Sequence, residues 1–275
     1  MEGRSPKDTF ITIYGRMPVH EVLQDESLQV DKVLVADNAQ GESLERILAL
    51  ARRRGVPVRS ATPHRVKVLA GNGKQDQGVL ADVVAPRMRP LLDFTDRIRP
   101  GRCHVLVLDG VNNPANVGMI IRTATAAGLS GVVLPRSGSP SIDPLVIKAS
   151  AGVAFRASII RCRTGAEAAA EFSGAGFRVY GLSGAAPSGA AATSLYAEDI
   201  PDRAVFVLGN ETAGVTRETE DWVDRWLSIP MARGVESLNV ASAAAVVCFD
   251  LVRRTTQAQA QAQAPARRAD RVRHR

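Results

Sequence analysis

Polar residues that could take part in catalysis gather in three stretches of the second half of the chain. The first stretch, NNPANVGMIIRTA (112–124), follows a predicted strand and is typical of a helix start with an apolar buried stripe. Asn116 is placed to cap this helix, and Arg122 falls roughly 155° from the centre of the stripe. Arg122 would therefore stay on the open side of the helix, at a strand's carboxyl end, where α/β sheets bind ligands. Taken alone, the same residues also fit a capping Asn and a solvated Arg.

The second stretch is the glycine-rich LGNETAG (208–214). Gly209 would let the backbone approach a ligand closely, and Glu211 could accept hydrogen bonds from ligand or backbone. Val215 follows Gly214 where a phosphate-binding P-loop needs Lys, and the GxGxxG dinucleotide fingerprint is absent too. An ordinary glycine turn fits this stretch equally well.

The third stretch, IPMARGVESLNVASAA (229–244), joins a predicted strand to the last helix. Pro230 ends the strand, and Ser237 or Asn239 is placed to begin the helix as its cap. A capped loop without further function is the simpler interpretation of this stretch alone.

Cysteine and histidine are too sparse and too scattered to indicate a metal site or a disulfide framework. The three cysteines, Cys103, Cys162 and Cys248, form no CxxC pair, and the four histidines do not cluster in the sequence. No apolar run approaches the ~20 residues of a membrane span, and the N-terminus lacks a signal-type stretch. We therefore expect a cytoplasmic protein without a metal and without a membrane partner.

The positive charge is concentrated at the two ends of the chain. The net charge is +7 overall, of which residues 1–100 carry +3, residues 101–250 carry −2 and residues 251–275 carry +6. Nucleic-acid phosphates attract such segments, so RNA contacts are expected in the first part and in the tail. A solvated, charged chain end explains the tail equally well.

Alternating strand and helix patterns predict two α/β units. In the first unit, residues 1–84, strands are expected at 30–36, 56–58 and 78–84, with a helix at 42–54 and a Thr62-Pro63 helix start. Residues 85–102 carry three prolines and five arginines and are interpreted as a linker. Apolar strands and helices alternate through 103–256, which favours a mostly parallel sheet covered on both faces. The low-complexity segment 257–275 is expected to be a disordered basic tail.

Taken together, the three stretches resemble the motifs of the SpoU (TrmH-like) methyltransferases of the SPOUT superfamily. The matching sequences are NPANVGMIIRTA, FVLGNETAGV and IPMARGVESLNVASAAAV, with KASAG (148–152) between the first two. The resemblance covers roughly 104–254. In the first unit, YGRMPVHEVL (14–23) and DQGVLADV (76–83) look like the substrate-binding domain of this family, which resembles kink-turn-binding ribosomal proteins. Relatives often carry His where this chain has Asp76.

The resemblance implies a knotted catalytic domain that uses S-adenosylmethionine. The last part of the chain would form a deep trefoil knot, and family members are usually homodimers with the site at the interface. Arg122 would stabilise the attacking ribose oxygen, with Asn116, Glu211, Ser237 and Asn239 as its polar surroundings. The residues implied as cofactor-binding are Leu208, Gly209, Asn210, Ile229, Met231, Ser237 and Leu238.

The implied activity is 2′-O-methylation of ribose in RNA, most simply in 23S ribosomal RNA. A separate N-terminal domain of this type is more typical of the ribosomal-RNA enzymes than of the tRNA enzymes. A tRNA methyltransferase, a catalytically silent RNA-binding protein and an unrelated nucleotide-binding α/β enzyme are the alternatives. Cofactor and RNA binding would distinguish them.

Overall fold

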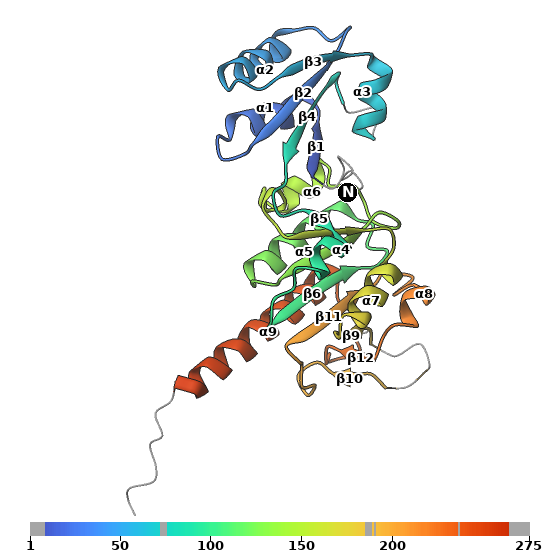
Figure 1. The fold of residues 1–275 in the computed structure, drawn as a ribbon. Coiled ribbons are helices and arrows are strands. Elements are labelled where there is room, and N and C mark those ends of the chain that lie inside the picture. Colours follow the sequence, from blue (N-terminus) through green and yellow to red (C-terminus); the bar gives the residue numbers. More distant parts are fainter. Residues whose placement is uncertain (1–8, 72–75, 185–188, 190, 236, 264–275) are drawn as a thin grey trace, which may run out of the picture.

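The computed structural model describes residues 9–263, apart from 72–75, 185–188, 190 and 236 (Figure 1). Two sheets organise this part of the chain, one in each predicted α/β unit. No helix among the described residues is long and apolar enough to cross a membrane.

The first sheet has four strands in the order β1-β4-β2-β3. Strand β4 pairs antiparallel with β1 and β2, whereas β2 and β3 are parallel. The strands are β1 (Phe10–Tyr14), β2 (Val30–Ala36), β3 (Val58–Ala61) and β4 (Val79–Val84). Helices α1 (Arg16–Gln24) and α2 (Glu42–Arg53) cover one face and α3 (Pro63–Ala70) covers the other (Figure 1). The predicted three-layer arrangement is confirmed.

Local sequence signals explain most of these elements, and a local hydrogen bond explains why one strand begins later than predicted. Thr62 caps α3 by accepting a hydrogen bond from the backbone N–H of Arg65, as its place before Pro63 predicts. The strand expected at 56–58 begins instead at Val58, because the backbone N–H of Val56 donates to Ala51 O (2.9 Å) and closes the end of α2. Sequence periodicity did not identify β1 and α1.

The predicted linker 85–102 contains structured residues that belong to the second sheet. Strand β5 (Arg89–Pro90) lies at one edge of this sheet and pairs parallel with the strand Ile159–Cys162, and helix α4 (Leu91–Thr95) follows directly. Leu91 is buried in the core beneath the helix Gly165–Gly174, so this segment is attached to the second unit rather than spanning freely between two domains.

The second sheet has eight strands in the order β10-β12-β9-β11-β6-β7-β8-β5, and every strand pair in it is parallel. The strands not yet given are β6 (Cys103–Leu108), β7 (Gly131–Pro135), β8 (Ile159–Cys162), β9 (Arg178–Leu182), β10 (Thr193–Ser194), β11 (Arg203–Leu208) and β12 (Arg225–Ser228). The helical elements are α5 (Pro114–Ala126), α6 (Pro144–Ala149), η2 (Val153–Phe155), α7 (Gly165–Gly174), α8 (Arg217–Glu220) and α9 (Val240–Gln263).

Strand β6 shows why both faces of this sheet are covered. All six of its residues are buried, and alternate side chains enter different cores. Leu106 and Leu108 pack with α5 and α9, whereas Val105 and Val107 pack with α7. A continuous apolar run in a parallel strand requires this double cover, as the sequence predicted.

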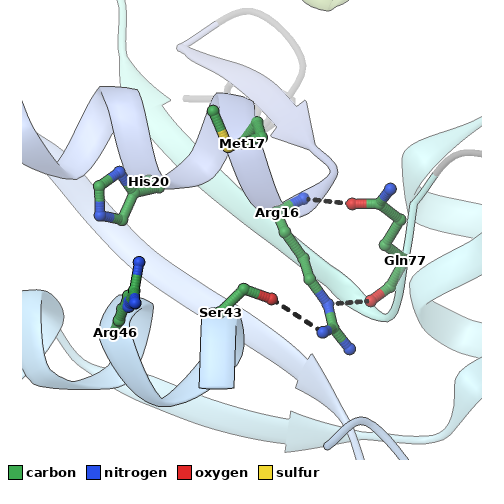
Figure 2. Close-up of a pocket in the computed structure, with 6 residues that line it drawn as sticks. All are labelled: Arg16, Met17, His20, Ser43, Arg46 and Gln77. Atoms are coloured by element: carbon green, nitrogen blue, oxygen red, sulfur yellow. Dashed lines mark hydrogen bonds between the residues drawn. The ribbon is translucent and has the colours of Figure 1, made fainter. Parts of the chain in front are cut away.

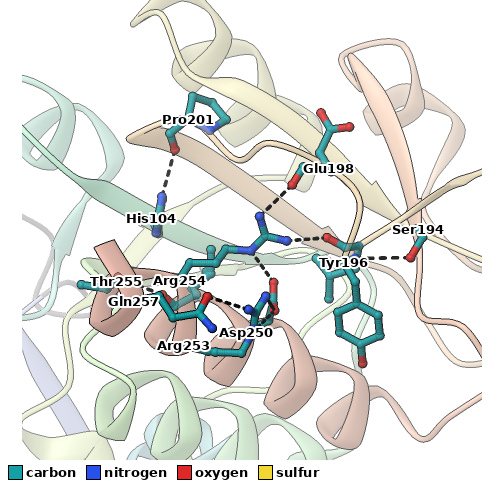
Figure 3. A network of polar contacts seen from close by, with 12 residues as sticks. His104, Ser194, Tyr196, Glu198, Pro201, Asp250, Arg253, Arg254, Thr255 and Gln257 are labelled. Atoms are coloured by element: carbon teal, nitrogen blue, oxygen red, sulfur yellow. Dashed lines mark hydrogen bonds and ion pairs between the residues drawn. The ribbon is translucent and has the colours of Figure 1, made fainter. Parts of the chain in front are cut away.

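Arginine side chains fasten the last helix to the sheet side of the domain (Figure 3). Arg254 donates to the backbone oxygens of Glu198 and Leu195, both at 2.7 Å, and to the buried Asp250 carboxylate at 2.6 Å. Helix α9 then continues to Gln263, past the predicted start of the tail at 257. Alternating Ala and Gln are good helix formers, so a helix already anchored by packing extends through them. The remaining tail residues, 264–275, lie outside the described residues.

Candidate functional site

Parallel strand order brings the three polar stretches to one edge of the second sheet. Strands β6 and β11 are neighbours with Leu108 opposite Leu208, so the loops that follow them start side by side. Strand β9 pairs with β11 on its other side and with β12. The loops after β6, β11 and β12 therefore meet at the carboxyl ends of adjacent strands, where open α/β sheets bind ligands.

Asn116 joins the three loops through its side-chain amide. The amide nitrogen donates to the Glu211 carboxylate, and the amide oxygen accepts from Asn239 Nδ2 at 3.1 Å. Asn116 is only 5% exposed, whereas Glu211 and Asn239 are exposed, so the hydrogen bonds are shielded from water on the Asn116 side. These three residues converge in the structure, as the sequence predicts, but the predicted place of Asn116 at the helix cap is wrong. Asn113 caps α5, since it precedes Pro114 and accepts from Ala115 N, and this leaves Asn116 inside the helix.

Asp109 is a structural residue of this region that sequence reasoning missed. Its carboxylate accepts from the backbone N–H and the hydroxyl of Thr216, at 2.7 and 2.8 Å. On the same side, Asn210 Nδ2 donates to Gly110 O at 3.0 Å. These contacts tie the loop after β6 to both ends of the loop after β11. The sequence signal that could have identified Asp109 is its place directly before a glycine at the end of a strand.

A cavity of about 270 Å³ opens where these loops meet. All seven residues implied as cofactor-binding line it, and so does Glu211. Apolar walls with a few polar groups are typical of sites for small organic ligands. Sequence reasoning missed several lining residues, among them Leu182, Ser183 and Gly184 after β9. Ligands bind at the carboxyl ends of parallel strands, so the end of the apolar run 177–182, which is typical of a strand, could have indicated them. The lining residues are Leu182, Ser183, Gly184, Leu208, Gly209, Asn210, Glu211, Thr212, Gly214, Leu227, Ile229, Met231, Ser237, Leu238, Val240 and Ala243.

Gly209 is required by the loop's own backbone. A Cβ at this position would lie 2.2 Å from Gly214 C and 2.3 Å from Val215 N. Asn210 and Gly214 exchange two backbone hydrogen bonds, which fold the loop back tightly on Gly209, and Gly214 takes a φ of 74°. The sequence predicted close approach to a ligand, whereas the structure shows close approach of the loop to itself.

Arg122 is exposed and lies outside the lining of the cavity. It makes no hydrogen bond or ion pair with any residue in the described part of the chain. It shares an exposed stripe of α5 with Ala115, Met119 and Ala126, and on the neighbouring helix α9 Phe249 is 52% exposed. The fold therefore holds Arg122 on the open side of α5, as the stripe geometry predicts, with the exposed apolar side chain of Met119 one turn before it.

The cysteines offer no alternative chemistry. Burial raises the pKa of Cys162 and Cys248 to about 12 and also raises the pKa of Cys103, so all three thiols are protonated near neutral pH. Within the described ranges, no group of three or more His, Cys, Asp or Glu side chains could hold a metal ion.

Comparisons with known protein families match both units of the chain. A model of the SpoU rRNA Methylase family matches residues 104–249. A second model, described as RNA 2′-O ribose methyltransferase substrate binding, matches residues 12–89. The first match covers most strands of the second sheet, and the second match covers most of the first sheet.

Curated relatives share most of their length with this chain. A 23S rRNA (guanosine-2′-O-)-methyltransferase RlmB from Xylella fastidiosa (strain 9a5c) is 36% identical over 89% of this chain and 96% of the relative. The RlmB of Xanthomonas axonopodis pv. citri is 33% identical over 88% of this chain and 95% of the relative.

Solved structures share the fold. An AdoMet-bound rRNA methyltransferase from Sinorhizobium meliloti matches with a TM-score of 0.60 and 24% identity, over 90% of this chain and 88% of the other. The SpoU methyltransferase AviRb from Streptomyces viridochromogenes, in complex with AdoMet, matches with a TM-score of 0.60 and 22% identity, over 90% and 91% of the two chains.

Proposed function

The chain belongs to the SpoU rRNA Methylase family, and we propose that it transfers the methyl group of S-adenosylmethionine to a ribose 2′-hydroxyl of 23S ribosomal RNA. The observation that carries this proposal is the hydrogen-bonded convergence of Glu211, Asn116 and Asn239 beside a cavity lined by the family's motif residues. The relatives' names supply the RNA target, and their match along nearly the whole chain includes the first domain.

The cavity suits S-adenosylmethionine in its chemistry. Leu208, Ile229 and Leu238 offer apolar walls for an adenine ring, and Ser237 offers a hydroxyl. The Glu211 carboxylate lines the cavity and suits a ligand with a positively charged sulfonium, because opposite charges attract. When bound, this cofactor supplies a methyl group that is already activated for transfer.

The protein's task is then to position the ribose and to help its hydroxyl lose a proton. The carbon–sulfur bond breaks as the oxygen–carbon bond forms, and the hydroxyl proton leaves to solvent. We assign Arg122 to this step as a fixed positive charge beside the developing alkoxide, because a guanidinium remains protonated at neutral pH. A DNA strand lacks the 2′-hydroxyl and would not react.

The proposal includes a homodimer that completes the site. Met119 on α5 and Phe249 on the adjacent helix α9 are exposed apolar side chains, and exposed apolar side chains are common at protein interfaces. Arg122 lies on the same stripe of α5 as Met119 and outside its own chain's cavity, and we propose that a second copy docks on this stripe so that the Arg122 of one protomer serves the cavity of the other. Sedimentation of the purified protein tests this, and Phe249→Glu should shift it to monomer with loss of methyl transfer.

Transfer of labelled methyl from S-adenosylmethionine to unmodified 23S rRNA and tRNA transcripts tests the activity. We expect 23S rRNA to be labelled, and Arg122→Ala to reduce the rate by roughly 10²–10³-fold with unchanged cofactor affinity. The control is Arg178→Ala, an exposed arginine at the start of β9. Labelling of tRNA alone would contradict the target, and RNA binding without any cofactor binding would contradict the enzyme.

A further inference from the structure

A second cavity, of about 630 Å³, lies on the first domain where α1 and α2 begin (Figure 2). It lies in the domain of the four-stranded sheet, whereas the cavity described above lies in the domain of the eight-stranded sheet, and the two cavities share no lining residue. Five of its six lining residues have polar or charged side chains, among them two arginines and a histidine, although most of the surface facing the cavity is carbon. The lining residues are Arg16, Met17, His20, Ser43, Arg46 and Gln77.

Helical spacing gathers these side chains on one side of the domain. Arg16 and His20 are four residues apart on α1, and Ser43 and Arg46 are three apart on α2, so each pair shares one helix face. The opposite faces of both helices are apolar and buried against the sheet. The cationic face is therefore exposed by the same amphipathic pattern that builds the core.

The Arg16 guanidinium is held in place by neutral partners alone. It donates to Ser43 Oγ at 2.9 Å, to Gln40 O at 2.8 Å and, through Nε, to Gln77 O at 3.4 Å. It forms no ion pair with any carboxylate in the described part of the chain. Of its five N–H donors, two remain for a ligand, and its charge is not compensated. Such a fixed, unpaired guanidinium suits a phosphate oxygen.

Gln77 secures Arg16 at some conformational cost. Its φ is 49°, in the left-handed region that residues other than glycine seldom adopt. Asp76 Oδ1 accepts from Gly78 N at 2.8 Å and stabilises the turn, while Gln77 Oε1 accepts from Arg16 N at 2.9 Å. The Asp at 76, where relatives often carry His, thus contributes to the loop. Unfavourable backbone conformations retained in this way are typical of functional sites.

The remaining charges also favour an anion. Arg46 pairs with Glu42 at 2.5 Å, but both side chains are largely exposed, and exposed pairs exchange readily with other partners. Glu42 does not line the cavity. The first turn of α1 carries no acidic residue, whereas Glu42 and Glu45 offset the partial positive charge at the start of α2.

We propose that this Arg16–Arg46 groove binds a backbone phosphate of the RNA substrate, with Met17 packing on the adjoining sugar or base. Met17 is 68% exposed at the groove, so its side chain is available to pack on a bound sugar or base. This inference rests on the proposed function, since it takes RNA as the substrate. It locates the affinity for RNA in a specific groove of the first domain.

Filter binding of the full-length protein to unmodified 23S rRNA transcript, across a series of KCl concentrations, tests the groove. Arg46→Gln should weaken binding about tenfold and reduce the slope of log affinity against log salt by about 0.7–0.9, the value of one lost phosphate contact. The matched control is Arg53→Gln, which removes the same charge from an exposed position on the same helix. It should change affinity less than twofold.

Two results would overturn the inference: unchanged affinity in Arg46→Gln, or equal losses in Arg46→Gln and Arg53→Gln, since equal losses mean that only overall charge matters. Arg16→Lys is a second variant, because it keeps the charge but loses the guanidinium geometry, and it should also weaken RNA binding. Titration of wild-type protein with S-adenosylmethionine separates the two proposals. Absence of cofactor binding contradicts the enzyme, whereas the difference between the Arg46 and Arg53 variants tests the groove by itself.

Discussion

The two cavities are assembled by different forces. In the second domain, Glu211, Asn116 and Asn239 come from three distant loops and are joined by hydrogen bonds around a largely buried amide. In the first domain, Arg16 and Arg46 lie near the starts of two adjacent helices; Arg16 is half-buried and Arg46 is exposed to solvent. The first arrangement depends on the exact path of three loops, whereas the second depends on charged side chains held at fixed positions on two helices. Substitutions should therefore act cooperatively in one and independently in the other.

The strongest test of this difference is Gly209→Ala. The new methyl group would overlap the backbone of Gly214 and Val215, so the loop must move. We expect a loss of about 3 kcal/mol in the free energy of unfolding and no measurable S-adenosylmethionine binding. Denaturant unfolding and calorimetry measure the two effects. Gly174→Ala is the control, since a Cβ there meets nothing within 4 Å. An unchanged cofactor affinity in Gly209→Ala would break the comparison.

A second test addresses the hydrogen bonds themselves. Asn116→Ala leaves Glu211 and Asn239 without their shared partner, which should cost about 1–3 kcal/mol and weaken cofactor binding at least tenfold. Asn116→Asp should be worse, because it places a second carboxylate next to Glu211. Asn113→Ala is the matched control on the same helix. It removes the cap and about 1 kcal/mol of stability but should leave cofactor affinity unchanged.

The sequence predicted the second domain well because its signals are local. Apolar runs identified the parallel strands, and strand order then explains why loops far apart in sequence converge. Asn116 illustrates the limit, since its partnership with Glu211 and Asn239 depends on tertiary contacts. The cap position was wrong because Asn113 and Pro114 start the helix three residues earlier than the apolar stripe suggests. The predicted trefoil knot concerns the path of the whole backbone and remains a prediction.

The first domain was harder to predict for a related physical reason. The motif around Arg16 and the Asp76-Gln77-Gly78 turn were noticed as separate stretches, but their contact joins residues about sixty positions apart. No periodicity indicates that Gln77 takes a left-handed conformation. Strand β5 in the predicted linker was missed because two residues are too few to show alternation. Its pairing with β8 depends on tertiary contacts that the local sequence does not indicate.

Removing one carboxylate from each region gives the smallest and most selective test. Glu42→Gln frees Arg46 from its exposed partner and removes a charge that repels phosphate, so RNA affinity should rise about twofold. Stability should change by no more than about 0.5 kcal/mol, because exposed pairs contribute little. Glu211→Gln keeps an oxygen that can accept from Asn116 but loses the charge, and cofactor affinity should fall about threefold. Filter binding measures the change in RNA affinity, and calorimetry measures the change in cofactor affinity, in both variants. RNA affinity should rise in Glu42→Gln and cofactor affinity should fall in Glu211→Gln, because the cavity of the first domain binds an anion and that of the second domain a cation. If both affinities rose or both fell, this assignment of RNA to the first domain and cofactor to the second would be wrong.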